Sequence, residues 1–349
     1  MIKNMKAAIL LKSNSDLIFD TIQLPDTLSV GQVFVKIKYS GICGSQIGEI
    51  RATKGPDKYL PHLLGHEAVG RVIDTGPGVK KVKRGDKVIL HWVKSAGLDS
   101  DPPYYKWNNK KLNSGKITTF SQYSICPENR VTKISKSLND LKAVMFGCAI
   151  PTAFGVFDNV VNIKIGNSVV IIGCGGVGLN LVSAAKFHGG FPIYALDLNP
   201  RRVKFAKKIG ADKGFVIGKE RSLAKILKTL SHKNKLDYII DNTGNTAVIN
   251  ESYRYLDSNG TLVLLGVPHH KKNINIHSLD LHFGKKIIGV EGGSVNPASD
   301  FPRYLKFFRN KNFRPENFVD KIFSLKQINK AINYMKKDKN IGRVILECT

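Results

Sequence analysis

The stretch from Ser168 to Asp197 most constrains what this chain can fold into. It opens with a short apolar run, Val169 to Ile172, and passes through glycines spaced G-x-G-x-x-G into a segment that favours a helix. A second apolar run then ends in an acidic residue, about twenty residues beyond the glycines. Strand, glycine-rich turn, helix, second strand and terminal acid together predict a unit that binds a dinucleotide.

The glycines of this stretch have separate expected roles. Gly173 permits a tight turn, Gly175 lets the backbone approach a pyrophosphate, and Gly178 lets the helix pack closely on the strand. The free N–H groups at the start of the helix would face the anion.

Asp197 indicates which dinucleotide is bound. Its carboxylate would hold the ribose hydroxyls of NAD, and a 2′-phosphate would meet that carboxylate at close range, so we expect NAD to be preferred over NADP. Arg201 and Arg202 follow directly and could pair with such a phosphate, which leaves NADP as the alternative.

Length and cysteine content limit the class of protein. The chain has 349 residues, which suits two domains. No apolar run approaches the roughly 20 residues of a membrane span, and the N-terminal segment is soon charged again at Lys12, so we expect a cytoplasmic protein with no membrane partner. The five cysteines are irregularly spaced and odd in number, which favours reduced thiols or metal ligands over disulfides.

The formal net charge of +27 raises the question of nucleic-acid binding. The basic residues are spread along the whole chain, and no cluster has interleaved aromatics or a recognisable nucleic-acid module around it. We therefore expect a lysine-rich surface and no specific nucleic-acid partner. A positive field would still raise the local concentration of anionic substrates.

The patterning changes twice along the chain. Residues 1–150 show short β-branched or alternating runs between turn residues, which predicts a small barrel-like β domain. Residues 151–290 alternate strands with helices, which predicts a doubly wound parallel sheet. Residues 291–349 are too few for a third domain and are expected to return to the first. The predicted strands are 6–11, 17–24, 33–39, 68–74, 88–93, 169–173, 193–197, 214–217, 236–241, 262–267 and 344–346, and the predicted helices are 177–188, 201–209, 223–230, 248–256, 301–309 and 328–336.

Three residues are candidates for a metal site. Cys43 lies in G-I-C-G-S after the strand at 33–39, His66 lies in L-G-H-E-A before the strand at 68–74, and Cys148 lies in F-G-C-A-I-P-T at the border of the first two regions. Each residue alone is more often structural, because a buried cysteine packs as a small hydrophobe. Their spacing alone is a weak signal.

The motifs G-I-C-G-S, G-H-E, F-G-C-A-I-P-T-A-F-G and I-G-C-G-G-V-G, in this order, resemble the zinc-dependent medium-chain alcohol dehydrogenases over nearly the whole chain. The resemblance implies a GroES-like catalytic domain and a Rossmann domain, with the C-terminal segment rejoining the catalytic domain. It implies one catalytic zinc held by Cys43, His66 and Cys148, NAD as cofactor, and a homodimer or homotetramer.

The resemblance also implies roles for other residues. Glu67 matches an acid beside the zinc ligands, Ser45 a hydroxyl that exchanges a proton with the substrate oxygen, and Thr152 a residue against the nicotinamide. Arg343 resembles a C-terminal arginine that contacts the pyrophosphate. The residues assigned to cofactor binding are Gly173, Gly175, Gly176, Val177, Gly178, Asp197, Arg202, Leu265, Gly266, Val267 and Arg343.

The chemistry agrees with this assignment. Two thiolates and an imidazole leave the fourth tetrahedral position open, as in a catalytic zinc site. The metal would lower the pKa of a bound alcohol or water and make hydride departure to the nicotinamide C4 feasible near neutral pH.

The chain departs from the family pattern in three places. Gln46 stands where an aspartate usually orients the ligand histidine; its amide can accept the imidazole N–H but raises ligand basicity less. Gly48 stands where some members have a proton-relay histidine. Residues 91–110, where relatives often bind a second zinc, contain no cysteine, so we expect one zinc per chain and a lobe held by the packing of Trp92, Pro102, Pro103, Tyr104, Tyr105 and Trp107. Cys126, Cys174 and Cys348 are expected to be packing residues.

The sequence therefore predicts an NAD-dependent zinc oxidoreductase that interconverts a primary or secondary alcohol with its aldehyde or ketone. One alternative is a polyol or sugar dehydrogenase of the same family, whose substrate bears several hydroxyls or a phosphate. A catalytically inactive binding relative and a nucleic-acid binder are further alternatives.

Overall fold

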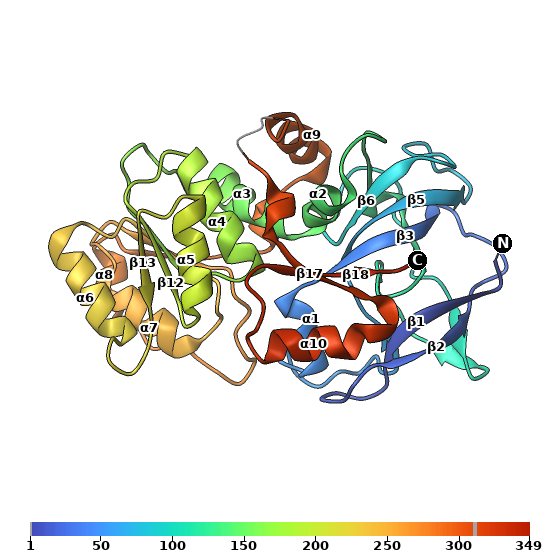
Figure 1. The fold of residues 1–349 in the computed structure, drawn as a ribbon, viewed down its shortest axis with the longest axis horizontal. Helices are drawn as coiled ribbons and strands as arrows, with labels where there is room; N and C mark the ends of the chain where they lie inside the picture. Colours follow the sequence, from blue (N-terminus) through green and yellow to red (C-terminus); the bar gives the residue numbers. More distant parts are fainter. Residues whose placement is uncertain (1, 310–312) are drawn as a thin grey trace. The chain divides into compact units, whose positions relative to one another are not determined.

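The computed structural model describes residues 2–309 and 313–349 (Figure 1). Contacts divide the chain into two compact units. The first consists of Met1–Ala52, Pro56–Pro151 and Asn296–Thr349, and the second of Thr53–Gly55 and Thr152–Val295.

The first unit contains an antiparallel sheet of five strands in the order β4-β1-β2-β7-β8. The strands are β1 (Asn4–Leu10), β2 (Ile18–Gln23), β4 (His62–Leu63), β7 (Tyr105–Trp107) and β8 (Lys110–Leu112). Strands β7 and β8 form a hairpin whose Trp107 indole donates to Asp20 at 2.8 Å. The hairpin ties part of the cysteine-free segment to the N-terminal strands.

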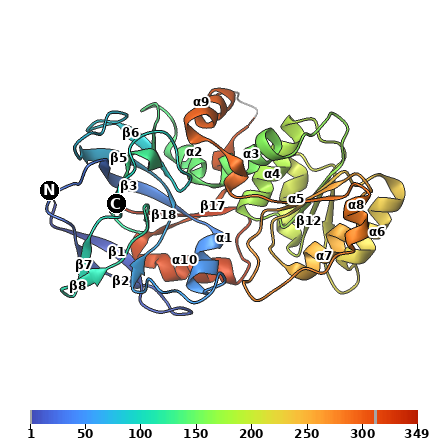
Figure 2. The same ribbon diagram turned by 180° about the vertical axis from the view of Figure 1, so that it is seen from behind.

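A second sheet of the same unit joins N-terminal and C-terminal residues. Its order is β10-β6-β5-β3-β18-β17, with β9 also pairing with β3. The strands are β3 (Gln32–Ile42), β5 (Glu67–Thr75), β6 (Lys87–His91), β9 (Tyr123–Pro127), β10 (Val131–Lys133), β17 (Val319–Ser324) and β18 (Arg343–Glu347). Figures 1 and 2 show the red strand β18 beside the blue strand β3, with which it pairs antiparallel.

Strand β3 is buried on both faces. Val33, Val35 and Ile37 belong to one apolar core, and Phe34 belongs to the other. Strand β3 belongs to the second sheet alone, but its two faces pack into different apolar cores. The helices of the unit are α1 (Gly44–Ile50), η1 (Glu128–Arg130), α2 (Asp140–Val144), η2 (Met145–Gly147), α9 (Pro297–Phe307), η5 (Pro315–Phe318), η6 (Leu325–Gln327) and α10 (Ile328–Lys336), with α3 (Ala149–Gly155) crossing the boundary between units.

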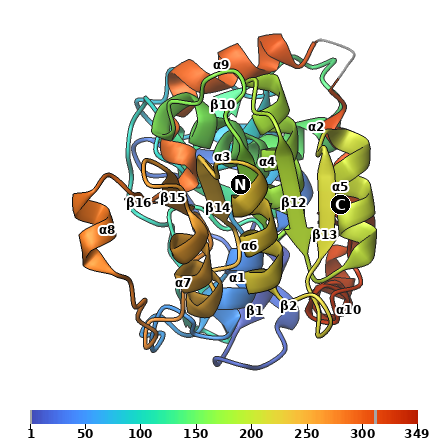
Figure 3. The same ribbon diagram turned by 90° about the vertical axis from the view of Figure 1, so that its left-hand side faces the viewer.

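The second unit is built on six parallel strands in the order β13-β12-β11-β14-β15-β16. They are β11 (Val169–Ile172), β12 (Ile193–Asp197), β13 (Lys213–Val216), β14 (Tyr238–Asp241), β15 (Thr261–Leu264) and β16 (Lys286–Gly289). The helical elements are η3 (Val156–Val160), α4 (Gly176–Phe187), α5 (Pro200–Ile209), α6 (Leu223–Lys233), α7 (Thr246–Tyr255), α8 (Ser278–His282) and η4 (Gly292–Ser294). Figure 3 shows β13 with α5 at one edge of this sheet and β16 at the other.

The helices of this unit pack in two pairs, α4 with α5 and α6 with α7. Val170 and Ile172 point into the core that contains α6 and α7. Because side chains alternate along a strand, the neighbouring residues Val169 and Ile171 face the opposite side of the sheet. This confirms the predicted doubly wound parallel sheet. Several boundaries differ from the prediction by one to three residues; strand β15, for example, ends at Leu264 rather than at residue 267, and the next two N–H groups both bond to the carbonyl of Asp241.

Among the described residues, no single helix is long and apolar enough to cross a membrane. One pair, Asp140–Gly147 and Ala149–Val160, passes by length and composition only when taken together, and it is bent by 57°.

Candidate active site

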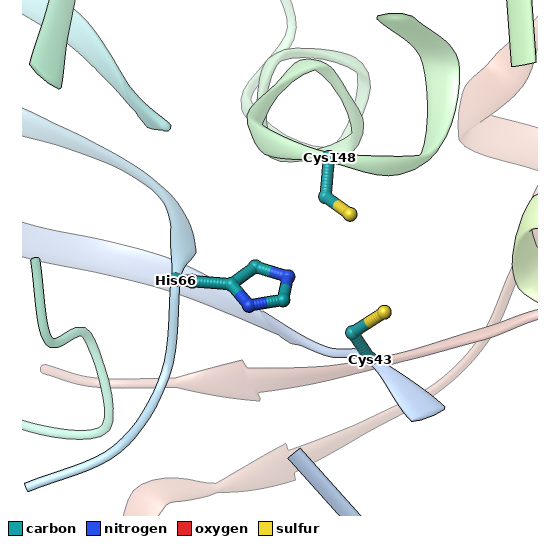
Figure 4. A group of neighbouring side chains, drawn as sticks. All are labelled: Cys43, His66 and Cys148. Carbon is teal, nitrogen blue, oxygen red and sulfur yellow. The ribbon is translucent and has the colours of Figure 1, made fainter. Parts of the chain in front are cut away.

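Cys43, His66 and Cys148 come together in the first unit. One ligand atom from each, the two sulfurs and a ring nitrogen of His66, lie within 4.8 Å of one another. Figure 4 shows the three side chains pointing toward a common point from separate segments. Both cysteines are buried and the histidine is half-buried.

Strand pairing explains why these distant residues meet. Strands β3 and β5 are antiparallel, with Ser40 opposite Ala68, so the end of β3 lies beside the start of β5. Cys43 directly follows β3, and His66 directly precedes β5. Helix η2 packs against β5 and β6 and delivers Cys148 at its end.

The donor set fits zinc. Sulfur and imidazole ligands suit this ion, and three protein ligands leave one tetrahedral position for a substrate oxygen. The Nε2 atom of His66 is buried and has no hydrogen-bond partner in the described part of the chain. An unpaired buried ring nitrogen is costly unless something coordinates it, so this atom is the expected metal-binding atom.

The two thiols affect each other's ionisation. The pKa of Cys43 lies well below the ordinary thiol value, first because of its interaction with Cys148, and then because Arg343 and His66 outweigh the effect of burial. The pKa of Cys148 lies well above the ordinary value, first because of Cys43 and then because of burial.

Gln46 contacts His66, but through its side-chain nitrogen rather than through the oxygen that the sequence analysis expected. Its Oε1 accepts from the backbone N–H of Cys43 at 3.1 Å, and its Nε2 lies 2.5 Å from Nδ1 of His66. The amide nitrogen, and not the oxygen, therefore faces the imidazole. Gln46 is 2% exposed, so little water competes for these contacts.

Glu67 and Arg343 form a buried ion pair beside the ligands. Glu67 Oε1 contacts an Nη of Arg343, and the two residues are 0% and 3% exposed. Burial raises the pKa of Glu67, and the guanidinium opposes that rise. The structure thus places Arg343, which the resemblance assigned to the pyrophosphate, against the acid next to His66.

The other two residues predicted to be catalytic, Ser45 and Thr152, lie in helices α1 and α3. Ser45 is in the first turn of α1, and its Oγ is buried without a hydrogen-bond partner among the described residues. Gly48 lies in the same helix. Thr152 lies in α3, in the second unit, and is 7% exposed.

The glycine turn of the second unit has the geometry that an anion site needs. Gly173 has φ +92°, and a Cβ on Gly178 would lie 1.9 Å from the Gly173 carbonyl oxygen, so neither position tolerates a side chain. A Cβ on Gly175 would meet no atom of the chain within 4 Å. Helix α4 begins at Gly176 and has no side-chain cap, which leaves its first N–H groups available to a phosphate.

Two carboxylates at the ends of strands hold this turn and the neighbouring one. Asp197 accepts from the N–H of Cys174 at 2.6 Å and from that of Asn199 at 2.8 Å, and Arg202 lies 3.7 Å away. Asp241 accepts from the N–H groups of residues 243 and 244. We did not predict the role of Asp241, although its place at the end of an apolar run was a usable signal.

The other predicted cofactor residues follow the strand ends of the second unit. Val177 is half-buried in the first turn of α4. Leu265 and Gly266 are half-buried in the loop after β15, and Val267 is 48% exposed.

The cysteine-free lobe is held partly by a carboxylate that the sequence analysis missed. Glu128 accepts from the N–H groups of Lys80 and Lys81 at 2.6 Å and from that of Leu98 at 2.8 Å. Burial alone would raise the pKa of Glu128, but these three N–H groups hold it below its usual value. Of the aromatic residues expected to pack the lobe, Tyr105 is buried, whereas Tyr104 is 52% exposed.

Comparison with known proteins agrees with this geometry. Residues 29–136 match the family model described as the alcohol dehydrogenase GroES-like domain, and residues 176–310 match that of the zinc-binding dehydrogenases. Alcohol dehydrogenase 1 of Petunia hybrida is 27% identical over 97% of this chain and 96% of its own. A probable S-(hydroxymethyl)glutathione dehydrogenase 1 of Schizosaccharomyces pombe is 26% identical with the same coverage. The structure of benzyl alcohol dehydrogenase from Acinetobacter calcoaceticus superposes with a TM-score of 0.88 at 22% identity, covering all of both chains.

A GroES-like unit with a Cys-His-Cys group and a Rossmann unit with a glycine-rich turn define a zinc-containing oxidoreductase. The chain belongs to the zinc-dependent medium-chain alcohol dehydrogenase family. The predicted fold class, the enzyme class and the cofactors zinc and NAD are thereby confirmed. The roles of individual site residues remain predictions.

Proposed function

We propose that this enzyme interconverts a primary or secondary alcohol with its aldehyde or ketone, using zinc held by Cys43, His66 and Cys148. The observation that carries the proposal is the buried convergence of two sulfurs and an unpaired imidazole nitrogen. When bound, zinc supplies Lewis-acid polarisation of the substrate oxygen, and NAD accepts or returns the hydride.

The residues of the chain would orient the substrate and move its proton. Ser45 Oγ, which has no other partner among the described residues, would accept the proton of the substrate hydroxyl while its own hydroxyl proton passes to water, and both transfers would run backwards in the reverse direction. The guanidinium of Arg343 would balance the negative charge of Glu67 and of the thiolates. Thr152 would contact the nicotinamide.

The cofactor would bind at the glycine turn. The N–H groups at the start of α4 would hold the pyrophosphate, and the open space beside Gly175 would admit it. Asp197 would bind the ribose hydroxyls, with Arg202 beside it. Val177 and residues 265–267 would line the rest of the site.

The test is a screen of primary, secondary and polyhydroxylated alcohols followed by NADH absorbance. We expect turnover with NAD that is lost when a chelator removes the metal. Turnover that survives complete zinc removal would contradict the proposal.

The net charge of +27 favours a second candidate substrate class, alcohols that carry a negative charge. One matched relative is named for S-(hydroxymethyl)glutathione, an anionic substrate. Sugar phosphates and S-(hydroxymethyl)glutathione therefore belong in the same screen. A kcat/KM for them that falls with salt, while that of neutral alcohols does not, would support this class.

We propose a second copy of this chain as the protein partner. Strand β16 is at the edge of its sheet, and the adjoining segment exposes Leu279, Leu281 and Phe283, the last at 67%. An unpaired strand edge beside apolar side chains suits a twofold interface. Light scattering should give a dimer or tetramer that Phe283→Lys weakens.

All five cysteines are free, in keeping with the proposed cytoplasmic location.

A further inference from the structure

The carboxamide of Gln46 serves two buried groups at once. Its oxygen accepts from the Cys43 N–H at 3.1 Å, and its nitrogen lies 2.5 Å from Nδ1 of His66. The Nε2 atom of the same ring faces the two sulfurs and has no hydrogen-bond partner among the described residues. Gln46 therefore contacts one nitrogen of the ring whose other nitrogen would hold the metal.

This arrangement fixes where the imidazole proton lies. An amide nitrogen only donates hydrogen bonds, so Nδ1 of His66 must be the acceptor in this contact. The proton of the neutral ring then lies on Nε2. A histidine ligand must offer an unprotonated nitrogen, so this tautomer cannot bind zinc through Nε2.

The opposite orientation of the amide has its own cost. With the carboxamide turned over, its oxygen would accept the Nδ1–H of His66, and Nε2 of the ring would be free for the metal. The amide nitrogen would then face the Cys43 N–H, which places two donors together. Since Gln46 is 2% exposed, little water is available to relieve that contact.

We propose that Gln46 is a positioning residue that favours the non-binding tautomer of His66 and thereby weakens zinc binding by this chain. The inference rests on the proposed zinc site. It requires no change in the three ligands, because Gln46 acts only through the ring of His66 and the backbone of Cys43.

The substitution Gln46→Glu removes the conflict between the two hydrogen bonds, because an amide has only one oxygen that can accept. A glutamate has the same length, and its two oxygens can accept from the Cys43 N–H and the His66 Nδ1–H together. Hydrogen-bond partners of metal ligands typically alter metal affinity by about 10- to 100-fold. We therefore expect Gln46→Glu to bind zinc at least about tenfold more tightly than wild type.

A matched variant separates this effect from added negative charge. Gly44 lies next to Cys43 at the start of α1, and a Cβ there would meet no atom within 4 Å. Gly44→Asp therefore adds a carboxylate at an exposed position next to Cys43, has room for its Cβ, and leaves Gln46 in place. We expect its zinc affinity to stay within about threefold of wild type, since exposed charges interact weakly.

The experiment titrates zinc-loaded, full-length protein with a chromophoric chelator and obtains the zinc dissociation constant of each variant. A Gln46→Glu affinity within threefold of wild type, or an equal gain in Gly44→Asp, would overturn the inference. A wild-type chain that binds no zinc would instead contradict the proposed function, and the inference with it.

A second measurement needs only the wild-type fold. Nitrogen-15 spectra of zinc-free, histidine-labelled protein report the tautomer of each ring, and the His66 signal is assigned by its loss in His66→Asn. We expect the wild-type ring to be protonated on Nε2 and the Gln46→Glu ring on Nδ1. Protonation of the wild-type ring on Nδ1 would overturn the inference.

Discussion

The glycine turn of the second unit and the metal site of the first unit are built on different principles. Around the turn, main-chain N–H groups bond to Asp197 and Asp241, so the chain itself fixes its shape. Around the metal site, His66 Nε2 and Ser45 Oγ are buried without hydrogen-bond partners in the described part of the chain. The shape of the turn is thus fixed by hydrogen bonds within the chain, whereas the metal site has buried side-chain atoms that have no partner in the described part of the chain.

This difference has an energetic consequence. An unsatisfied buried polar atom costs roughly 1–3 kcal/mol, and a ligand that pairs it returns that free energy. Metal binding is therefore expected to stabilise the first unit, while NAD binding uses a turn that is already formed. The predictions below test this contrast from the largest expected effect to the smallest.

Loss of a metal ligand should have the largest effect. We expect Cys43→Ala, His66→Ala and Cys148→Ala each to abolish turnover, because the substrate oxygen loses its electrophile. NADH affinity, measured by fluorescence titration, should stay close to wild type, because the turn belongs to the other unit. Ser45→Ala should slow turnover and keep zinc. Wild-type rates in all three ligand variants would contradict the mechanism.

A methyl group in the glycine turn should have the opposite effect: NADH binding should be weakened while zinc binding is kept. The Cβ of Gly175→Ala meets no atom of the chain, so we expect wild-type folding and zinc content but much weaker NADH binding, because the methyl occupies the path of the pyrophosphate. Gly218→Ala, whose Cβ also meets open space, is the control and should bind NADH normally. Unchanged NADH affinity in Gly175→Ala would show that the cofactor does not approach this backbone.

Zinc removal should loosen only the first unit. We expect chelation to lower the melting temperature by about 10 °C, as for loss of a ligand that contributes about 4 kcal/mol. Hydrogen exchange should accelerate in peptides covering 43–50 and 62–70 and stay unchanged in 169–180. Equal acceleration in both regions would remove the proposed contrast.

Glu128 offers a test of the cysteine-free lobe. Glu128→Gln places an amide nitrogen opposite one or more backbone N–H groups, so we expect a loss of about 2–3 kcal/mol in unfolding free energy. The folded-state pKa is lowered, so the carboxylate stabilises the fold above the unfolded pKa of about 4.3 and loses this effect as the pH falls through the folded value. Denaturant titrations at pH 7 and pH 3 should show the difference between the two proteins shrinking at pH 3.

Cofactor preference should show the smallest effect. We expect a higher kcat/KM with NAD than with NADP, and Asp197→Ala should narrow the gap. Since Asp197 also braces the N–H groups of residues 174 and 199, the variant should weaken NAD binding as well. Comparable kcat/KM for the two cofactors in the wild type would contradict the assigned role of Asp197.

Local patterns explain which parts of the fold the sequence predicted well. Strand β12 and helix α10 match their predicted bounds, because apolar periodicity and flanking turn residues are local signals. The hairpin of β7 and β8 was missed because its strands have three residues each. Such short strands depend on pairing with β2, which no local pattern encodes.

The candidate site likewise combines features that local motifs predict with features that depend on contacts between distant segments. The three candidate zinc ligands were predicted from motifs, but the pairing of Arg343 with Glu67 depends on β18 lying beside β3, a contact across about 300 residues of chain. The orientation of the Gln46 amide depends on a balance between two hydrogen bonds. Glu128 escaped notice because one carboxylate in a sequence gives no sign that it accepts from backbone N–H groups, whereas Asp241 was missed although it ends an apolar run.

Zinc stoichiometry tests the central claim most directly. Metal analysis of extensively dialysed protein should return one zinc per chain for the wild type and for Glu128→Gln, and none for Cys148→Ala. Among the described residues, Cys126, Cys174 and Cys348 are not members of the Cys-His-Cys group, and the lobe is held by hydrogen bonds and packing. Two tightly held zinc ions per wild-type chain, or one retained by Cys148→Ala, would contradict the account.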